Sequence, residues 1–171
     1  MKILVTGGCG YIGSHTVLAL AERGFDVVVL DNLHNSSVES IKRVERMSGK
    51  TIPVVVGDIT DQACLESLFA SHHIDSVVHF AGLKSVAESV SNPLEYYDVN
   101  VGGTCKLLVA MAKVGCRKIV FSSSATIYGV EATTPYNETM ARGTTVHPYG
   151  SSKSMIEMIL EDLCASSSTW A

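Results

Sequence analysis

The sequence predicts an α/β fold in which a doubly wound parallel sheet is covered by helices, and three observations support it. Short apolar runs rich in β-branched residues alternate with segments of helical periodicity. The first run enters a cluster of glycines, and the second ends at Asp31. Alternating strands and helices form parallel sheets through right-handed crossovers. We therefore expect the strand order 3-2-1-4-5, with a ligand crevice at the carboxyl ends of the strands, between strands 1 and 4.

The expected elements follow from periodicity and from local signals at their ends. Ser36-x-x-Glu39 forms a capping box that opens the second helix. Asn92 and Pro93 are a suitable cap and first-turn pair for a later helix. The expected strands are 3–5, 26–30, 52–56, 75–79 and 118–121. The expected helices begin near Tyr11 and then cover 36–48, 61–70, 86–90, 92–115 and the stretch from Pro148 onward.

The expected helix over 92–115 carries two apolar stripes, although a helix that covers a sheet needs only one. We interpret the second stripe either as core beneath a loop or as an oligomer contact, and we expect a homodimer. The first stripe contains Leu94, Tyr97, Val101, Cys105, Leu108 and Ala112, and the second contains Tyr96, Gly103, Leu107, Ala110 and Val114.

Length and composition favour one globular domain, residues 1–171, in the cytoplasm. A hydrophobic fraction of 46% supports a real core. The net charge of -4 argues against nucleic acid or an anionic membrane as the main partner, and no apolar run is long enough to span a bilayer. The five cysteines are scattered, which predicts reduced thiols and no metal site.

The glycine cluster, Thr6 to Gly13, has the pattern of a turn that binds a dinucleotide. Gly8, Gly10 and Gly13 fit G-x-G-x-x-G, and a G-x-x-G-x-x-G spacing starts equally well at Gly7. One glycine makes the turn, one lets the backbone approach a pyrophosphate, and one allows close packing of strand and helix. The following helix directs free N–H groups at the phosphates. Glycine-rich turns also occur in ordinary loops, so the motif needs an acidic partner.

Asp31 supplies that partner, eighteen positions after Gly13 at the end of the second apolar run. A carboxylate there accepts hydrogen bonds from the ribose hydroxyls and repels a 2′-phosphate, which favours NAD over NADP. Aspartate at a strand end is otherwise a common turn residue.

A second candidate stretch begins at Pro148. Tyr149 and Lys153 are four residues apart and share one helix face, so the ammonium favours the phenolate that a general base requires. The pair alone is common by chance, and its ordinary interpretation is an exposed helix start. The irregular segment 124–147 precedes it, and irregular loops of this length are usually functional or disordered.

Together these motifs resemble the extended short-chain dehydrogenase/reductase family over the whole chain, most closely the members that invert C4 of a UDP-sugar. The resemblance implies an NAD-binding Rossmann fold, a chain that stops before the last strands and the C-terminal substrate domain, and low activity for these 171 residues alone. One departure is Val99-Asn100, where many members have two asparagines. The matching stretches are 5–15, 30–33, 57–59, 79–84, 121–126 and Tyr149 with Lys153.

The resemblance also implies residue roles. Ser124, Tyr149 and Lys153 would form the catalytic group, and Lys84, Ser124 and Tyr149 would contact the sugar nucleotide. Tyr149 would remove the proton from the sugar 4-hydroxyl while C4 hydride moves to NAD, and Ser124 would bond the same oxygen. The implied cofactor contacts are Gly7, Gly10, Tyr11, Ile12, Gly13, Asp31, Asn32, Leu33, Asn35, Ser36, Asp58, Ile59, Phe80, Ala81, Gly82, Lys84, Ser122, Tyr149 and Lys153.

The expected reaction is therefore the interconversion of UDP-galactose and UDP-glucose with NAD regenerated in each cycle. A nucleotide-sugar 4,6-dehydratase is disfavoured because that chemistry uses an acidic pair after the strand-end serine or threonine, where this chain has Ala125 and Thr126. A plain reductase and a non-catalytic NAD-binding module are the remaining alternatives.

Overall fold

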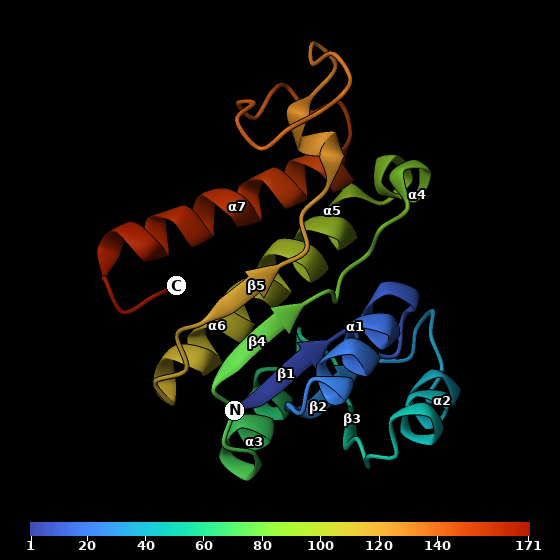
Figure 1. The fold of residues 1–171 in the computed structure, drawn as a ribbon. Helices are drawn as coiled ribbons and strands as arrows, with labels where there is room; N and C mark the ends of the chain where they lie inside the picture. Colours follow the sequence, from blue (N-terminus) through green and yellow to red (C-terminus); the bar gives the residue numbers. More distant parts are fainter. The chain divides into compact units, whose positions relative to one another are not determined.

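A computed structural model describes residues 1–171 and divides them into two compact parts. The first part contains residues 1–81, 106–122 and 171, and the second contains 82–105 and 123–170. The first part holds a five-stranded parallel sheet in the order β3-β2-β1-β4-β5, which confirms the expected topology (Figure 1). Its strands are β1 Lys2–Thr6, β2 Asp26–Asp31, β3 Val54–Val56, β4 Ser76–His79 and β5 Ile119–Phe121.

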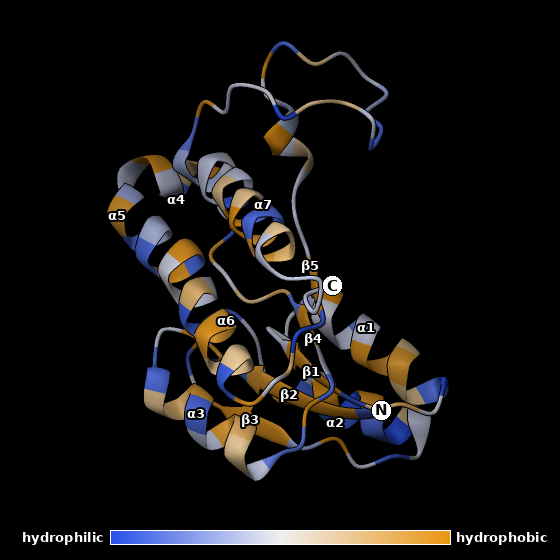
Figure 2. Ribbon diagram, turned by 90° about the vertical axis from the view of Figure 1, so that its left-hand side faces the viewer, coloured by the Kyte–Doolittle hydropathy of each residue, from blue (hydrophilic) through white to orange (hydrophobic).

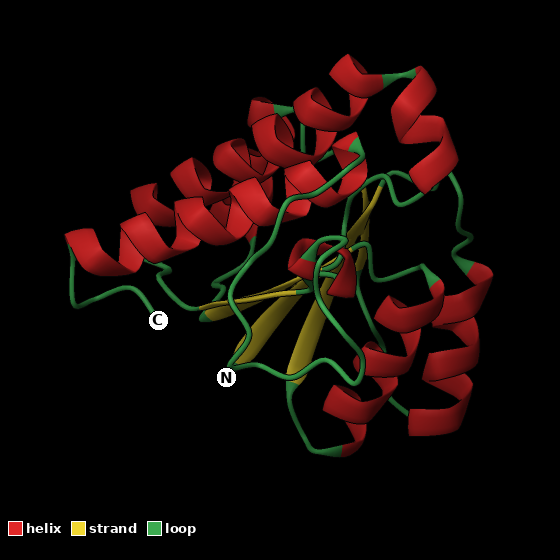
Figure 3. Cartoon of the chain, turned by 90° about the horizontal axis from the view of Figure 1, so that it is seen from above, coloured by secondary structure: helices red, strands yellow, loops and turns green.

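The register places the five strand ends at one edge of the sheet. Val5 of β1 lies between Val29 of β2 and Val78 of β4, and the strands fan out with the twist usual for parallel sheets (Figure 3). Because all strands run the same way, the glycine turn, Asp31 and Asp58 lie at the neighbouring carboxyl ends of β1, β2 and β3, respectively. The nucleotide-binding candidates are therefore collected by topology.

One face of the sheet is covered by α1 (Tyr11–Glu22) and α2 (Glu39–Ser48). The alternate strand residues Ile3, Val5, Val27 and Val29 form a core with Val17 and Ala21 of α1 and with Ile41 and Val44 of α2. The intervening residues, such as Leu4 and Val28, face the other way and are also buried. Helices α3 (Gln62–Ser71) and α6 (Gly103–Lys113) lie on that side of the strands (Figure 2).

Both expected caps are wrong, and the structure has one at Asp61 that was not predicted as a cap. The Ser36 hydroxyl does not cap α2: it points to Asp31, to which it donates, and the helix starts at Glu39 without a side-chain cap. Asn92 makes no capping hydrogen bond, although Pro93 does occupy the first turn of α5. Asp61 caps α3 by accepting from the Ala63 and Cys64 amides.

The second part is mainly helical. Helix α4 (Val86–Ser91), α5 (Pro93–Tyr96) and the π-helical turn η1 (Tyr97–Gly102) pack against α7 (Pro148–Ser166). The 3-10 turn η2 (Ala125–Tyr128) also contacts α7, and residues 129–147 are irregular, as expected. No helix in the structure has the length and apolarity needed to cross a bilayer.

The expected single helix over 92–115 is instead three consecutive segments, α5, η1 and α6. The widened turn shifts the helical phase, so the stripe that begins at Leu94 does not stay on one side. Leu94 is 81% exposed while Leu108 is buried. The other stripe supplies the core through Tyr96, Leu107 and Ala110, although Val114 is exposed.

Strand β5 has a backbone partner on its outer edge. The Ala171 amide donates to the Arg117 carbonyl, and the Ala171 carbonyl accepts from the Ile119 amide, at 2.9 and 2.8 Å. Ala171 thus bonds both residues that flank Lys118, and this is the hydrogen-bond pattern of two parallel strands.

Candidate functional site

The glycine turn between β1 and α1 needs glycine for steric reasons. Gly7 adopts φ +68°, and a Cβ there would lie 2.7 Å from the Ala81 amide nitrogen. A Cβ on Gly13 would collide with the Gly7 carbonyl oxygen and approach the Gly8 Cα to 2.8 Å. These contacts match the roles that the spacing predicted, a sharp turn and a close approach of strand and helix.

The start of α1 is arranged to accept an anion. Gly10 caps the helix without a side-chain hydrogen bond, and the first turn contains no acidic residue. The Tyr11 and Ile12 side chains are 78% and 60% exposed, so the chain leaves this end of the helix open. Unpaired N–H groups and the helix dipole together favour a phosphate at such a position.

Asp31 organises the loops beside the glycine turn. Its Oδ2 accepts from the Cys9 amide at 2.9 Å, and its Oδ1 accepts from the Leu33 amide at 2.9 Å and from the Ser36 hydroxyl at 2.7 Å. Leu33 is the one non-glycine residue with a positive φ, at 60°, a conformation that costs energy for an L-residue. The carboxylate thus holds both the glycine turn and a strained loop, and it keeps one of its roughly four acceptor positions.

Asp58 follows β3 and joins the same edge. Its Oδ2 accepts from Asn32 at 2.7 Å, and its Oδ1 accepts from the Thr60 amide and hydroxyl at 2.8 and 2.7 Å. Partial burial acts to raise the pKa of Asp58, but these hydrogen bonds and the charge of Lys106 outweigh it and lower the pKa. Ile59 beside it is buried, whereas Asn35 is exposed.

The stretch after β4 is divided between the two parts of the structure. Phe80 and Ala81 belong to the first, where the Phe80 amide donates to the Thr6 carbonyl at 3.0 Å. Gly82 and Lys84 belong to the second, as do Ser124, Tyr149 and Lys153, while Ser122 belongs to the first. Lys84 is exposed.

Tyr149 and Lys153 lie together at the start of α7. The Lys153 ammonium is 6.0 Å from the centre of the Tyr149 ring, as expected for residues one helical turn apart. Lys153 is only 6% exposed, and this burial lowers its pKa to about 8. A lysine with a lowered pKa exchanges protons near neutral pH more readily than an exposed one.

Ser124 is held beside the first turn of α7 through Thr126. The Thr126 hydroxyl donates to the Ser124 Oγ at 3.0 Å. The Thr126 Oγ1 also lies 3.3 Å from the position that a Cβ on Gly150 would occupy. Ser124 is therefore bonded to a residue that lies against Gly150, the residue that follows Tyr149.

Three residues that were not among the predicted site residues lie in this region. Asn100, in η1, bonds Leu83 and Ser152, His147 caps α7, and the Ser123 Oγ is buried with no hydrogen-bond partner. The available signal for Asn100 was its place beside Val99, where the family pattern has two asparagines. Histidine is an uncommon helix cap, and nothing local distinguished Ser123 from its neighbours.

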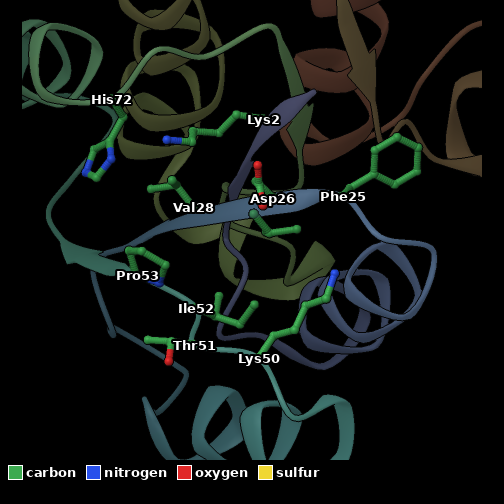
Figure 4. A pocket seen from close by; sticks show the side chains of 10 residues that line it. Lys2, Phe25, Asp26, Val28, Lys50, Thr51, Ile52, Pro53 and His72 are labelled. Carbon is green, nitrogen blue, oxygen red and sulfur yellow. The ribbon is translucent and has the colours of Figure 1, made fainter.

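A hollow of about 340 Å³ lies at the opposite edge of the sheet from the glycine turn. It is lined by Lys2 and Asp26 at the amino ends of β1 and β2, and by Lys50, Ile52 and His72 among others (Figure 4). It is wide open and carries charges of both signs. In parallel α/β sheets ligands bind at the carboxyl ends of the strands, so this hollow is not the candidate site.

The fold and the glycine turn define a dinucleotide-binding protein of the Rossmann type. Residues 3–170 match the model of the NAD dependent epimerase/dehydratase family. The chain belongs to this family.

Curated relatives and solved structures agree with this assignment. The UDP-glucose 4-epimerase of Erwinia amylovora is 57% identical over 162 residues, covering 95% of this chain and 48% of that protein. The Bacillus subtilis UDP-glucose 4-epimerase is 51% identical, covering 100% of this chain and 50% of the relative. A Bifidobacterium longum UDP-glucose 4-epimerase in complex with NAD+ and UDP superposes with a TM-score of 0.97 at 46% identity, covering 100% of this chain and 51% of that chain. The chain spans about half the length of these relatives.

Proposed function

We propose that the protein containing this sequence interconverts UDP-galactose and UDP-glucose at the sugar C4, with NAD bound at the glycine turn. The observation that carries the proposal is the catalytic group of the second part: Tyr149 beside the buried Lys153, and Ser124 fixed by Thr126 against the same helix turn. A module that only bound NAD would have no need for this arrangement. The relatives named above act on UDP-glucose, which supports the substrate class.

The first part fits NAD on its own geometry. The uncapped start of α1 suits a pyrophosphate, and the contacts of Gly7 and Gly13 leave no room for side chains beside it. Asp31 retains an acceptor position for a ribose hydroxyl of NAD. Its negative charge would repel the 2′-phosphate of NADP. We infer that Asn32, Leu33, Asn35, Ser36, Asp58, Ile59, Phe80, Ala81, Gly82, Lys84 and Ser122 complete the cofactor contacts.

The residues of the second part supply the acid–base chemistry. Tyr149 removes the proton from the 4-hydroxyl and later returns it, and Ser124 donates to the same sugar oxygen as its charge changes. Lys153 stabilises the Tyr149 phenolate through its charge. Bound NAD would supply a reversible hydride acceptor for C4, and return of the hydride to the opposite face of the 4-keto sugar would make the net reaction an isomerisation.

A dehydratase is again disfavoured at the residue level. The Thr126 hydroxyl is engaged with Ser124, and Ala125 has no polar side chain, so neither can serve as a second acid–base group. A plain reductase would consume NADH stoichiometrically, and this difference separates it from an epimerase in a single assay.

The test is a coupled assay of the full-length protein on UDP-galactose. We expect UDP-glucose to form without net NADH consumption. Tyr149→Phe should lower kcat at least 10²-fold because the base is lost. Tyr136→Phe, which keeps the ring that stacks on Tyr128, is the matched control and should be unchanged. Formation of a 4-keto-6-deoxy product, or stoichiometric NADH oxidation, would contradict the proposal.

We also propose that the full-length protein is a cytoplasmic homodimer. Val90, Leu94, Met155 and Met158 are exposed apolar residues of helices α4, α5 and α7, with exposures of 62, 81, 43 and 51%. Large exposed apolar residues on neighbouring helices are typical of subunit contacts. Light scattering should give twice the subunit mass, and Leu94→Glu should shift it toward the monomer.

A further inference from the structure

We propose that His147 is a positioning residue that holds the Tyr149 ring in its catalytic orientation. This inference rests on the proposed function, because it gives His147 a role only if Tyr149 is the base. Two independent contacts support it, a hydrogen bond that fixes the imidazole and a stacking contact that the fixed imidazole makes with the phenol.

The hydrogen bond makes His147 the cap of α7. The Gly150 amide donates to the His147 Nδ1 at 2.9 Å, and the His147 carbonyl accepts from the Ser151 amide at 3.1 Å. His147 has an extended backbone, with φ -150° and ψ 151°, and Pro148 occupies the first helical position. A cap residue satisfies an N–H group that the helix leaves unpaired. The bond to Nδ1 also prevents the ring from rotating freely.

The fixed imidazole then provides a flat surface for Tyr149. The two ring centres are 6.1 Å apart and their planes differ by 15°, within the range of offset stacked aromatic pairs. Tyr149 is the second residue of α7 and only half-buried, so the helix by itself leaves its ring free to change rotamer. Stacking on His147 removes part of that freedom at the side chain that must reach the sugar hydroxyl.

Gly150 makes room for this arrangement. A Cβ at Gly150 would lie 3.0 Å from the His147 Cε1 and 3.3 Å from Nδ1. A side chain there would push the imidazole away from both the Gly150 amide and the Tyr149 ring. Histidine, proline, tyrosine and glycine at 147–150 thus form one unit that starts the helix and orients its phenol.

The common helix caps could replace only half of this role. Asparagine offers an oxygen near the place of Nδ1 and is a favoured cap, but it has no aromatic face. Phenylalanine keeps the aromatic face and has no acceptor. His147→Asn and His147→Phe therefore separate the cap from the stacking contact, and His147→Ala removes both.

The experiment compares these variants in the full-length protein by kcat, KM and thermal midpoint. For His147→Asn we expect a thermal midpoint within about 2 °C of the parent and a kcat roughly tenfold lower at unchanged KM. For His147→Phe we expect a midpoint lower by about 2–4 °C and a kcat within about threefold. His73→Asn, at an exposed position two residues after α3, is the control for the replacement itself and should match the parent.

A second readout is independent of turnover. The ring protons of His147, assigned by their loss in His147→Asn, should be displaced by the ring current of Tyr149 and return to ordinary positions in Tyr149→Leu. A parental kcat in His147→Asn, or ring protons unmoved by Tyr149→Leu, would overturn the inference while leaving the epimerase activity intact. An inactive parent protein would instead overturn the proposed function.

Discussion

The side-chain amide of Asn100 donates to the Ser152 Oγ at 3.0 Å, and both residues are fully buried. The same amide group pairs with the Leu83 backbone, accepting from its N–H at 2.7 Å and donating to its carbonyl at 3.0 Å. Ser152 in turn donates to the Tyr149 carbonyl at 2.7 Å. One side chain from the π-helical turn therefore links the loop that precedes Lys84 to the turn of α7 that carries Tyr149.

Asn100→Ala should destabilise the protein by about 1–3 kcal/mol, because it leaves the Leu83 amide and carbonyl without their partner in a protected place. Ser152→Ala loses a single bond and should cost about 1 kcal/mol. Urea unfolding of both variants and of the double variant gives the coupling energy. Strictly additive effects would show that the network does not act as a unit.

Much of the fold could be predicted because its signals are local. The apolar runs gave all five strands within a few residues, and the glycine spacing gave the turn before α1. The failures arose where tertiary contacts compete with local preferences. Ser36 has a capping sequence, but its hydroxyl is turned toward Asp31, to which it donates, and it accepts from no amide of the first turn of α2. The widened turn at η1 contains the buried Asn100, whose bond to Ser152 links residues far apart in the sequence, and periodicity alone does not reveal such a contact.

The site shows the same division. Residues at strand ends could be placed from topology, as with Asp31 and Asp58. His147 could not, because its role depends on a side-chain orientation and on the space above Gly150.

Gly13→Ala should abolish binding of NAD. The new Cβ would meet the Gly7 carbonyl and the Gly8 Cα, both backbone atoms that cannot rotate away, so the turn must open. Gly102→Ala is the matched control, since its Cβ would make only an ordinary contact of 3.4 Å with the Asp98 side chain. Calorimetric titration with NAD measures both. Equal affinity in the two variants would place the dinucleotide elsewhere.

Asp31→Asn should weaken NAD binding at least tenfold and lower stability by about 1–3 kcal/mol. The amide replaces one carboxylate oxygen by a donor, which then faces either the Cys9 amide or the Leu33 amide and Ser36 hydroxyl. Asp26→Asn, at the exposed start of the same strand, should change neither quantity. If Asp31→Asn loses stability but binds NAD normally, the carboxylate serves the loops alone.

Arg142 should anchor the irregular segment 129–147 to α7. Its guanidinium forms a two-point pair with Glu161 at 2.6 and 2.7 Å and a longer contact with Glu157 at 3.4 Å. Arg142→Gln should cost about 1 kcal/mol and speed chymotryptic cleavage in the segment. Glu161→Gln should also speed cleavage, Glu157→Gln should do so less, and Glu138→Gln should match the parent. A parental cleavage rate in Arg142→Gln would show that the segment is held by other contacts.

The buried ammonium of Lys153 should make stability depend on pH in a defined window. Burial lowers its pKa from the ordinary 10.5 to about 8 in the folded chain. Between pH 8 and 10.5 the unfolded chain binds more protons than the folded chain, so the free energy of unfolding should rise with pH. Below about pH 8 the lysine is charged in both states, and the folded chain bears the full cost of burying that charge. The upper limit of the rise is ~3 kcal/mol.

The Cys9 thiol acts in the opposite direction above pH 9, because burial and, to a smaller extent, the charge of Asp31 raise its pKa to about 11. Because Cys9 is common to the parent and Lys153→Met, its effect cancels in their difference. That difference, measured by urea unfolding from pH 7 to 10, should increase with pH, and a flat difference would show that Lys153 keeps an ordinary pKa.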